Sequence, residues 1–496
     1  MINGGWPILF SAILCVVLSY AFAQRRSARR HPLPPSPKSD PIIGHLRYVP
    51  TRYEEAVYKA WGDELNSNII SLQVLGQVIV ILNSTVDAQE LLVKRSLIYS
   101  DRPQLEMLSN PRLVGWGNTT TALNYGERWR IQRRLKHEVL QKKAIEVFWP
   151  VMVKRARLAM RRILEDPQNF ASEMSRLTGE TVLSTAYGYE VLTADDRMMK
   201  ILKVGVKGFC DAAVPGSFLV NSLPWLQHVP SWFPGAGWKR KVVGAAQPSV
   251  INSLLTKLAA HSASTHSADE EEEDRIKWAT GSLYGAASDT SAATTIVFIL
   301  AMIQYPDIQA KAQREIDTVV GDQRLPEMED SDQLPYMGRL IKEVLRWRPV
   351  LPLGVAHACT QDDMYRGYHI PKGAIVMANI WAMCNDPSVY ADPERFDPDR
   401  FLNPTVPEPP TFGFGRRSCP GIHFAESSLF ITISTMLAVF NITPARDKQG
   451  NDIIPDARMA PASLVRFPLD FECTIKPRPE ARAKLMSQYC SPPPRK

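Results

Sequence analysis

Residues Phe412–Gly421 read FGFGRRSCPG and hold a single cysteine, Cys419, close to several glycines. Glycine lets a backbone turn tightly and approach a flat cofactor closely. Arg417 stands two residues before the cysteine, where a guanidinium can pair with an anionic group of such a cofactor. Backbone N–H groups in a loop of this kind can hydrogen-bond the sulfur and tune it as a metal ligand. The stretch therefore predicts a metal-thiolate site, with Phe412 packed beside the sulfur.

An apolar helix is predicted directly after this loop, from about Gly421 to Phe440. Its positive N-terminal end would face the Cys419 sulfur, and we expect it to lower the pKa of the thiol. For a cysteine taken alone, the ordinary alternative is a glycine- and arginine-rich loop around a buried and inert thiol. The segments upstream favour the metal site over that alternative.

A second pattern lies in a helix predicted over Leu334–Trp347, which stops before Pro349. Glu343 and Arg346 are three residues apart, so they share one face of this helix and can form an ion pair. The spacing alone is common by chance. It gains weight because the segment DPERF (392–396) lies between it and the cysteine loop.

A long helix is predicted over Arg275–Gln304, just before Pro306, and it contains the run AASDTS at 286–291. Small residues would let this helix pass close over the face of a flat cofactor. The roles of Thr290 and Asp289 at a reacting centre are implied by the resemblance described below and not by this run alone. The ordinary alternative is that the Thr290 hydroxyl bonds the carbonyl one turn back.

Two further segments could face an anionic group, although the first would by itself be an ordinary start of an amphipathic helix and the second gains its role only from the resemblance described below. Trp129 and Arg133 are one helical turn apart within WRIQR (129–133), so both can face the same carboxylate. His357 ends the segment LPLGVAH (351–357) and could reach a carboxylate as well, although a lone histidine is more often structural.

Together these segments resemble the cytochrome P450 superfamily of haem-thiolate monooxygenases. The cysteine loop matches F-x-x-G-x-R-x-C-x-G at every fixed position, and the other segments follow in the family's order over about residues 33–475. Departures are Ala287, where glycine is usual, and Cys384 and Asn385, where His and Arg are commoner. The resemblance implies the cytochrome P450 fold, mainly α with minor β, and is strongest to microsomal fungal enzymes of secondary metabolism.

The resemblance also implies roles for individual residues. Cys419 would be the axial ligand of the iron of haem b, and Thr290 with Asp289 would be catalytic through proton delivery. The residues implied to bind the cofactor are Trp129, Arg133, His357, Phe412, Arg417, Cys419 and Gly421. The residues implied to form a structural ion-pair cluster near the haem are Glu343, Arg346 and Arg395.

The implied activity is insertion of one oxygen atom from O2 into a small hydrophobic substrate, with electrons from an NADPH-cytochrome reductase. One rival is a haem-thiolate isomerase or dehydratase of the same fold, and the retained acid–threonine pair argues against it. Another is an inactive membrane-anchored haem-binding scaffold.

For the reductase we expect a basic docking patch beside the cofactor, on side chains that helical spacing turns away from it. Its predicted members are Arg130, Arg134, Lys136 and Arg416.

The first segment predicts a membrane anchor. Residues 2–24 carry no charged side chain and are long enough to cross the roughly 30 Å hydrocarbon core as a helix. Four arginines follow at 25, 26, 29 and 30, which by the positive-inside rule leaves the body of the protein in the cytosol. The alternative, a cleaved signal peptide, needs its basic residues before the apolar stretch. We expect an endoplasmic reticulum protein with membrane lipid as a partner, comprising a transmembrane helix at 1–24, a basic and Pro-rich tether at 25–41 and a monooxygenase domain at 42–496.

The rest of the chain is predicted to be one α-rich domain with a minor β portion. Residues 68–84, NIISLQVLGQVIVILNS, predict a β-hairpin around a glycine turn. Further helices are predicted at Glu127–Phe148, Met152–Leu164 and Asn169–Tyr187. Ser262–Asp274 is predicted to be a solvated acidic loop, and Pro349–Pro410 to be irregular.

Composition sets the remaining expectations. The 496 residues are 45% hydrophobic and carry a net charge of +7. This excess is modest, and there is no zinc-finger spacing or long basic run, so nucleic acid is not an expected partner. The substrate cannot be read from the residues. We expect the segments that shape its pocket to be Gln104–Leu123, Gly205–Trp225 and Val350–Val355.

Overall fold

The computed structural model describes residues 31–193, 195–233, 236–239, 255–256, 270–461, 463–478 and 485, and the predicted anchor at 1–24 lies outside them. Helices outweigh strands in the described chain. The longer helices are α2 (Glu54–Glu64), α6 (Glu127–Leu140), α7 (Trp149–Glu165), α8 (Phe170–Tyr187), α9 (Arg197–Ala212), α12 (Glu270–Gln304), α13 (Pro306–Val319), α14 (Pro335–Trp347) and α16 (Ile422–Val439). The shorter α-helices are α3 (Thr85–Ala88), α4 (Ser96–Tyr99), α5 (Glu106–Ser109) and α15 (Ile380–Cys384).

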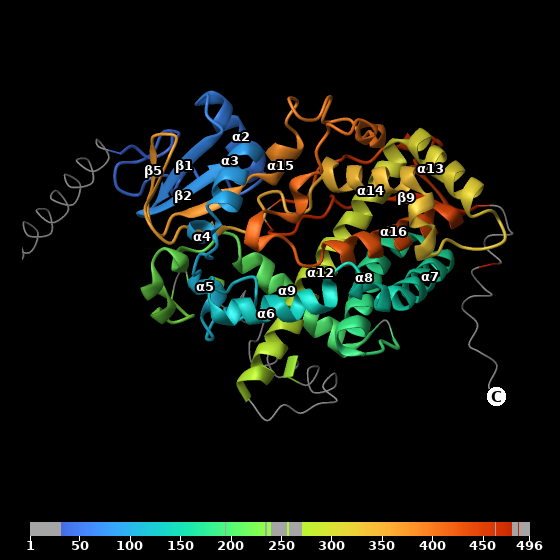
Figure 1. Ribbon diagram of the computed structural model, residues 1–496, viewed down its shortest axis with the longest axis horizontal. Coiled ribbons are helices and arrows are strands. Elements are labelled where there is room, and N and C mark those ends of the chain that lie inside the picture. The colour runs from blue at the N-terminus through green and yellow to red at the C-terminus, as the bar shows by residue number, and fades with distance from the viewer. Residues whose placement is uncertain are drawn as a thin grey trace, which may run out of the picture.

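The strands form three small sheets. They are β1 (Ile69–Val74), β2 (Gln77–Leu82), β3 (His357–Ala358), β4 (Asp363–Tyr365), β5 (Tyr368–Ile370), β6 (Ile375–Ala378), β7 (Phe440–Arg446), β8 (Asp452–Ile453) and β9 (Cys473–Pro477). The largest sheet has the order β1-β2-β6-β3, with β2 and β6 parallel and the other pairs antiparallel. The strands β4 and β5 form a hairpin, and β7 pairs with β8 and β9. Figure 1 shows the largest sheet at one end of the molecule, with the helical body beside it.

Short single-turn helices connect these elements. They are η1 (Gln89–Lys94), η2 (Ala144–Phe148), η3 (Pro167–Asn169), η4 (Leu219–Asn221), η5 (Pro224–His228), η6 (Met328–Gln333), η7 (Pro398–Leu402), η8 (Pro410–Phe412) and η9 (Gly415–Arg417). Two of them, η8 and η9, shape the loop that holds the predicted thiolate ligand.

The predicted hairpin is confirmed as β1 and β2, paired in register from Ile69 opposite Leu82 to Val74 opposite Gln77. The two residues of its turn, Leu75 and Gly76, both have positive φ angles. A two-residue hairpin turn needs this backbone shape to match the twist of its strands. Five of the six residues of each strand are buried, so the hairpin packs into the protein on both faces.

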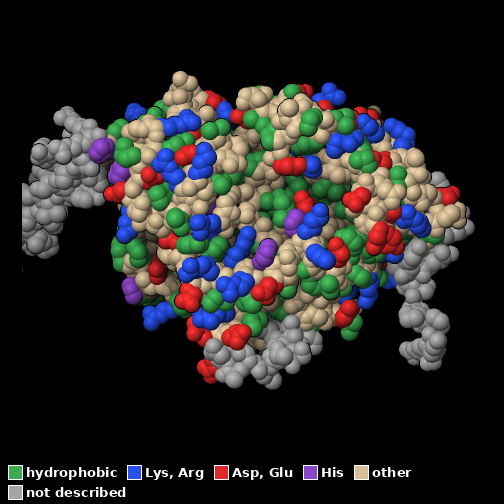
Figure 2. Space-filling model, viewed as in Figure 1, with side chains coloured by type: hydrophobic (Ala, Val, Ile, Leu, Met, Phe, Trp, Pro, Cys, Tyr) green, Lys and Arg blue, Asp and Glu red, His purple; other side chains and the backbone are tan. Residues whose placement is uncertain are grey.

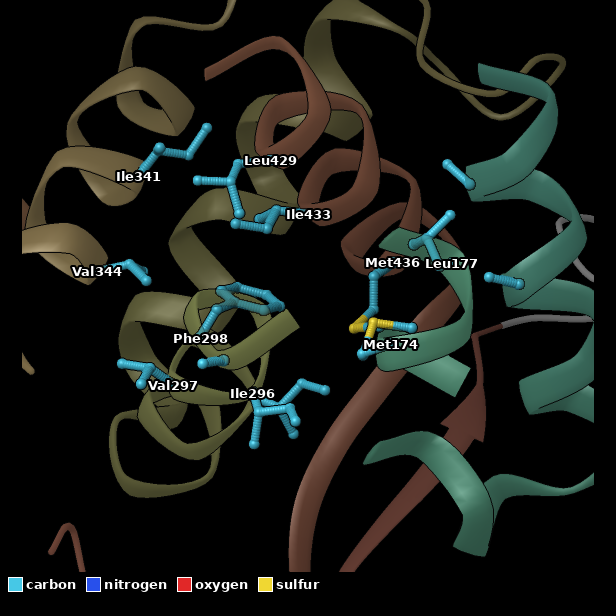
Figure 3. Packing of buried hydrophobic residues seen from close by; sticks show 14 of the residues in the cluster. Met174, Leu177, Ile296, Val297, Phe298, Ile341, Val344, Leu429, Ile433 and Met436 are labelled. Carbon is cyan, nitrogen blue, oxygen red and sulfur yellow. The ribbon is translucent and has the colours of Figure 1, made fainter. Parts of the chain in front are cut away.

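The long helix α12 is the central support of the fold and runs through the middle of the molecule in Figure 1. Its apolar segment packs on α8, α16 and α14, which surround it. Figure 3 shows side chains of these four helices meeting in one core, among them Phe298 of α12, Met174 of α8, Val344 of α14 and Ile433 of α16. This packing holds α12 rigidly where the site needs it.

Several boundaries differ from those predicted. Helix α12 begins at Glu270, so the last five residues of the predicted acidic loop are helical. Acidic side chains in a first turn are stabilised by the positive end of the helix, which the loop prediction overlooked. The predicted helix Glu127–Phe148 ends at Leu140, and Ala144–Phe148 forms η2 instead. The segment Pro349–Pro410 is more regular than expected, because it holds β3 to β6 and α15.

Within the described residues, α12 and α16 are each long and apolar enough to cross a membrane by length and composition. However, 78% and 72% of their most apolar windows are buried inside the protein, as in the core helices of a soluble domain. On the face shown in Figure 2, acidic and basic side chains are interleaved over much of the surface.

Candidate active site

A cavity of about 600 Å³ lies between α6, α12 and the cysteine loop. Its wall includes all the cofactor-binding residues predicted from the sequence: Trp129, Arg133, His357, Phe412, Arg417, Cys419 and Gly421. Each of the three segments expected to shape a substrate pocket also contributes to the wall, for example through Trp116, Phe209 and Val350. Segments that are far apart in the sequence therefore meet around one space, whose volume suits a cofactor or small molecule.

The cysteine loop is held in a tight, specific shape. The Cys419 N–H donates to the Phe412 carbonyl oxygen (2.8 Å), and the Ser418 N–H donates to the Gly415 carbonyl (3.1 Å). Gly415 has a φ of 56°, and a Cβ atom there would overlap the carbonyl oxygen of Leu92. Only glycine fits this position without moving the backbone of η1. The glycine is thus required by both the turn and its packing.

Cys419 lies in the cavity wall and keeps accessible surface there. The protein around the cavity nevertheless removes its thiol from bulk solvent. The prediction that this thiol has a lowered pKa is wrong for the protein alone. Burial raises the pKa of Cys419, and it outweighs the opposing effects of the Gly421 N–H group and the nearby charges of Arg133 and Lys136. A positive metal ion would reverse this balance, since coordination deprotonates a thiol.

Half-buried cations line the side of the cavity next to the cysteine loop. Arg417 donates to the carbonyl oxygens of Ser100 (2.7 Å) and Leu123 (2.7 Å), and its guanidinium lies 4.5 Å from the centre of the Trp129 ring. Burial lowers the pKa of Arg417 to about 10, and burial lowers that of Arg133 as well. Desolvation therefore disfavours both positive charges in the protein alone.

Arg102 is a further cation in the cavity wall that the sequence did not predict. It is 7% exposed and donates to the Val355 and Ala356 carbonyls (2.7 and 2.6 Å), and its buried Nε has no hydrogen-bond partner among the described residues. Burial and the charge of Arg417 lower its pKa far below the usual value. It also borders a second cavity of about 450 Å³ that contains none of the predicted site residues.

His357 lies in β3 and is 7% exposed. Its Nδ1–H donates to the Tyr99 carbonyl oxygen (2.7 Å), which leaves Nε2 as the free ring nitrogen. Burial lowers the pKa of His357 far below its usual value, and the charges of Arg102 and Arg417 add to that effect. The ring is neutral unless an anion enters the cavity and offsets these charges.

This set of residues fits the haem that the sequence predicts. Buried cations are ordinarily paired with anions, yet no ion pair to Arg102, Arg133 or Arg417 occurs within the described parts of the chain. Carboxylates on the edge of a flat cofactor would supply the missing charge, while the Cys419 thiol, next to these cations in the cavity wall, is a suitable metal ligand. The donors and the charges are thus those of a haem-thiolate centre.

Thr290 of α12 lines the same cavity. Its hydroxyl donates to the Ala286 carbonyl oxygen (2.6 Å), which is the bond expected if the residue were merely structural. That bond leaves the hydroxyl oxygen able to accept, and a rotation of the hydroxyl would let it donate into the cavity. The geometry is compatible with both interpretations.

Asp289 does not contribute to the cavity wall. Burial raises the pKa of its carboxyl group, while the Lys203 charge on α9 and the neighbouring Ser288 hydroxyl act to lower it. A carboxyl group with a raised pKa can hold or release a proton closer to neutral pH. Asp289 thus lies behind the threonine, between α12 and α9.

The structural ion-pair cluster contains Arg400 where Arg395 was predicted. Arg346 contacts Glu343 through Nε–Oε2 (2.7 Å) and Nη2–Oε1 (2.8 Å), and Arg400 Nε reaches the same Oε1 at 3.1 Å. Arg395 is exposed and contributes only its backbone carbonyl. The prediction for Arg395 is wrong because η7 turns the chain so that the later arginine points inward. Cys384, which stands where histidine is commoner, affects this cluster little, because only its backbone carbonyl contacts Arg346 (2.8 Å).

The predicted docking patch is also corrected. Arg130, Arg134 and Arg416 are exposed, but Lys136 is 4% exposed and lines the cavity. Lys136 is the seventh residue after Trp129, and a helical rotation of about 100° per residue returns it to nearly the same face. The sequence contained this signal, and the prediction misread it.

Comparisons with known proteins agree with the geometry. The family model described as Cytochrome P450 matches residues 34–465. Cytochrome P450 monooxygenase 208 of Postia placenta is 39% identical over 492 residues, covering 94% of each chain. Cytochrome P450 monooxygenase COX2 of Coprinopsis cinerea is 38% identical, covering 95% of this chain and 94% of its own. Cytochrome P450 monooxygenase claR of Ampulloclitocybe clavipes is 36% identical over 92% of this chain and 89% of its own.

Proposed function

Because this chain belongs to the cytochrome P450 family and is a haem-dependent monooxygenase, we propose that Cys419 is the axial thiolate ligand of its haem b. The observation that carries this is the position of its thiol in the wall of a cavity where Arg102, Arg133 and Arg417 form no ion pair within the described residues. Bound haem supplies the oxygen activation, and a thiolate ligand favours cleavage of the O–O bond. The protein supplies ligation, orientation and a water-poor pocket.

We assign the carboxylate edge of the haem to a cation cluster made of Arg102, Arg133 and Arg417. Arg133, Arg417 and Trp129 hold one carboxylate edge of the haem, and Arg102 extends the set that the sequence predicted. His357 joins them once the anion raises its pKa and lets Nε2 donate. Phe412 packs beside the sulfur, and Gly421 leaves room for the backbone to approach it. Charge neutralisation of this kind binds the cofactor and orients it.

Thr290 and Asp289 carry protons from α9 to the reacting centre. The Thr290 hydroxyl turns from the Ala286 carbonyl to donate into the cavity. Asp289, whose pKa is raised and whose carboxylate is attracted to Lys203, returns a proton to Thr290 from the α9 side. The substrate then occupies the apolar part of the wall, whose residues include Val182, Ala186, Phe209, Leu464 and Val465.

An NADPH-cytochrome reductase docks on Arg130, Arg134 and Arg416. These exposed side chains lie on α6 and in the cysteine loop, next to the cofactor end of the cavity. Arg416 is held by the Tyr125 hydroxyl (2.7 Å) and by Ser96 (3.0 Å), so its charge is fixed at the surface. In Figure 2 several basic side chains gather over the part of this face that α5 and α6 occupy in Figure 1. Rim charges of this kind set the rate of encounter with an acidic partner.

The uncharged segment 2–24 and the arginines behind it support a single-pass anchor in the endoplasmic reticulum membrane, contacting lipid, with the catalytic domain in the cytosol. On this proposal residues 1–24 span the bilayer, 25–41 form the tether and 42–496 form the monooxygenase domain. Expression of a chain that begins at residue 31, followed by membrane fractionation, tests the assignment. The truncated domain is expected in the soluble fraction.

The similar monooxygenases named above come from fungi, which supports a role in fungal secondary-metabolite biosynthesis. The substrate is a small hydrophobic molecule, and O2 is the co-substrate.

A haem-thiolate isomerase or dehydratase of the same fold would need no reductase, and an inactive scaffold would form no product. Purified protein should therefore be assayed against terpenoid, polyketide and indole compounds, first by Soret shift and then for products with and without NADPH and reductase. Product formation that requires both identifies the monooxygenase.

A further inference from the structure

Lys136 is a buried amine that the haem chemistry described above does not use. It lies on α6, is 4% exposed and forms part of the cavity wall. Its Nζ donates to the Ser282 hydroxyl oxygen of α12 (2.8 Å). That hydroxyl donates in turn to the Trp278 carbonyl (2.6 Å), so it presents a lone pair to the amine. Ser282 also lines the cavity, so the pair joins two helices at its wall.

The buried ammonium group of Lys136 has no anionic partner among the described residues. An ammonium group has three N–H donors, and only the bond to Ser282 is formed within the described chain. Lys136 forms no ion pair with a described carboxylate, and burial together with the charge of Arg133 lowers its pKa to about 7. A buried ammonium is costly unless an anion pairs with it. The cavity whose wall Lys136 lines offers open space for such an anion.

The position of Lys136 separates it from the cation cluster assigned to the haem carboxylates. Trp129, Arg133 and Lys136 lie on successive turns of one face of α6. Lys136 also feels the charges of Arg133 and Cys419, but its hydrogen bond runs away from the cluster, to Ser282 of α12. Its partner Ser282 precedes Thr290 by eight residues, or about 12 Å along the helix. That distance suits two ends of one small molecule.

We propose that Lys136 and Ser282 bind a carboxylate group of the substrate, so that the enzyme oxidises an acidic small molecule with an apolar body. The proposal rests on the proposed function and names the substrate class of that same site. The Thr120 hydroxyl, 3.2 Å from the Ser282 hydroxyl, and also in the wall, completes a polar corner. The remaining wall is largely apolar, which suits the body of the molecule.

Matched acid and alcohol probes test this in the full-length haem protein. The pairs are abietic acid with abietinol, dodecanoic acid with 1-dodecanol, and indole-3-acetic acid with tryptophol, each titrated by Soret shift. We expect at least one acid to bind at least about tenfold more tightly than its alcohol, as for a buried charge pair. Lys136→Met should bring that ratio to about one, and Lys136→Arg should keep it. Lys142→Met, a matched change at an exposed lysine, should leave it unchanged.

Each other outcome overturns the inference. If every acid and its alcohol bind equally to the wild-type protein, or if the ratio survives in Lys136→Met, the corner does not recognise a carboxylate. If Lys136→Met loses haem while Lys136→Arg retains it, the ammonium serves the cofactor instead. The reduced carbon monoxide spectrum of the same samples separates this inference from the proposed function. A wild-type protein without a thiolate band defeats the function, whereas a normal band without acid preference defeats only the carboxylate site.

Discussion

Glu343 and Arg346 form a two-point ion pair in α14, with both side chains 0% exposed and with N–O distances of 2.7 and 2.8 Å. Arg400 adds a third contact to the same carboxylate at 3.1 Å. The cluster joins α14 to η7 and, through the Cys384 carbonyl, to α15. It does not line the cavity, so its effect on the cofactor runs through the fold.

Removal of one partner from this cluster should lower the yield of soluble, haem-loaded protein. Glu343→Ala or Arg346→Ala leaves a buried charge unpaired, at a cost of about 3–5 kcal/mol. Arg400→Ala should have a smaller effect, and Arg395→Ala should have none, because that side chain is exposed. The measurement is haem content per milligram of soluble protein. Normal yield with lost turnover in the first two variants would instead make them part of the catalytic machinery.

Gly415→Ala should prevent haem incorporation. The new Cβ would overlap the Leu92 carbonyl oxygen and displace either η1 or the cysteine loop. Gly413→Ala is the matched control, since Gly413 also has a positive φ (74°) but has no atom within 4 Å closer than Ser418 Cα at 4.0 Å. Haem absorbance of the purified variants separates overlap from backbone strain. Equal loss in both variants would attribute the effect to strain alone.

Cys419→Ser should abolish the thiolate-type band in the reduced carbon monoxide difference spectrum. A serine hydroxyl stays protonated at neutral pH and is a far poorer anionic ligand than a thiolate. Cys210→Ser is the control, because Cys210 is another buried cysteine in the same cavity wall. It should keep the band. An unchanged band in Cys419→Ser would place the iron on a different ligand.

Thr290→Ala should retain haem and substrate binding but uncouple oxygen consumption from product formation. The hydroxyl is proposed to act on protons after the substrate has bound. Peroxide released per NADPH consumed is the measurement, and we expect it to rise severalfold. Thr295→Ala is the matched control, since Thr295 makes the same bond one turn back (2.9 Å) outside the cavity wall. Unchanged coupling in Thr290→Ala would leave the residue with its structural bond only.

Arg130→Gln combined with Arg134→Gln should slow turnover that is driven by NADPH and reductase, and should flatten its dependence on salt. Exposed charges act over the screening length of roughly 8–10 Å, so salt competes with their effect. Turnover driven by added peroxide bypasses the reductase and should change little. An equal fall in both assays would mean that these arginines stabilise the domain. Lys136 is kept in this test, because it is buried in the cavity wall.

The sequence by itself determined the features that depend on near neighbours in the chain. The match at Phe412–Gly421 marked the loop that brings Cys419 into the cavity wall, and the turn at Leu75 and Gly76 produced the hairpin. The spacing of Glu343 and Arg346 fixed their pairing, since residues three apart share a helix face. In each case the interacting groups are close in sequence, so pattern and spacing were sufficient.

Only the tertiary structure decided which distant groups meet. Arg102 enters the cavity because the chain before α5 folds against the segment that leads into β3, and no local pattern marks it. Arg400 replaces Arg395 because η7 reverses the chain next to α14. Helical spacing already places Lys136 on the Trp129 face of α6, but it is buried in the cavity wall only because α12 covers that face. Burial, and with it the charge state of each group, is set by segments far away in the sequence, so no local pattern could predict it.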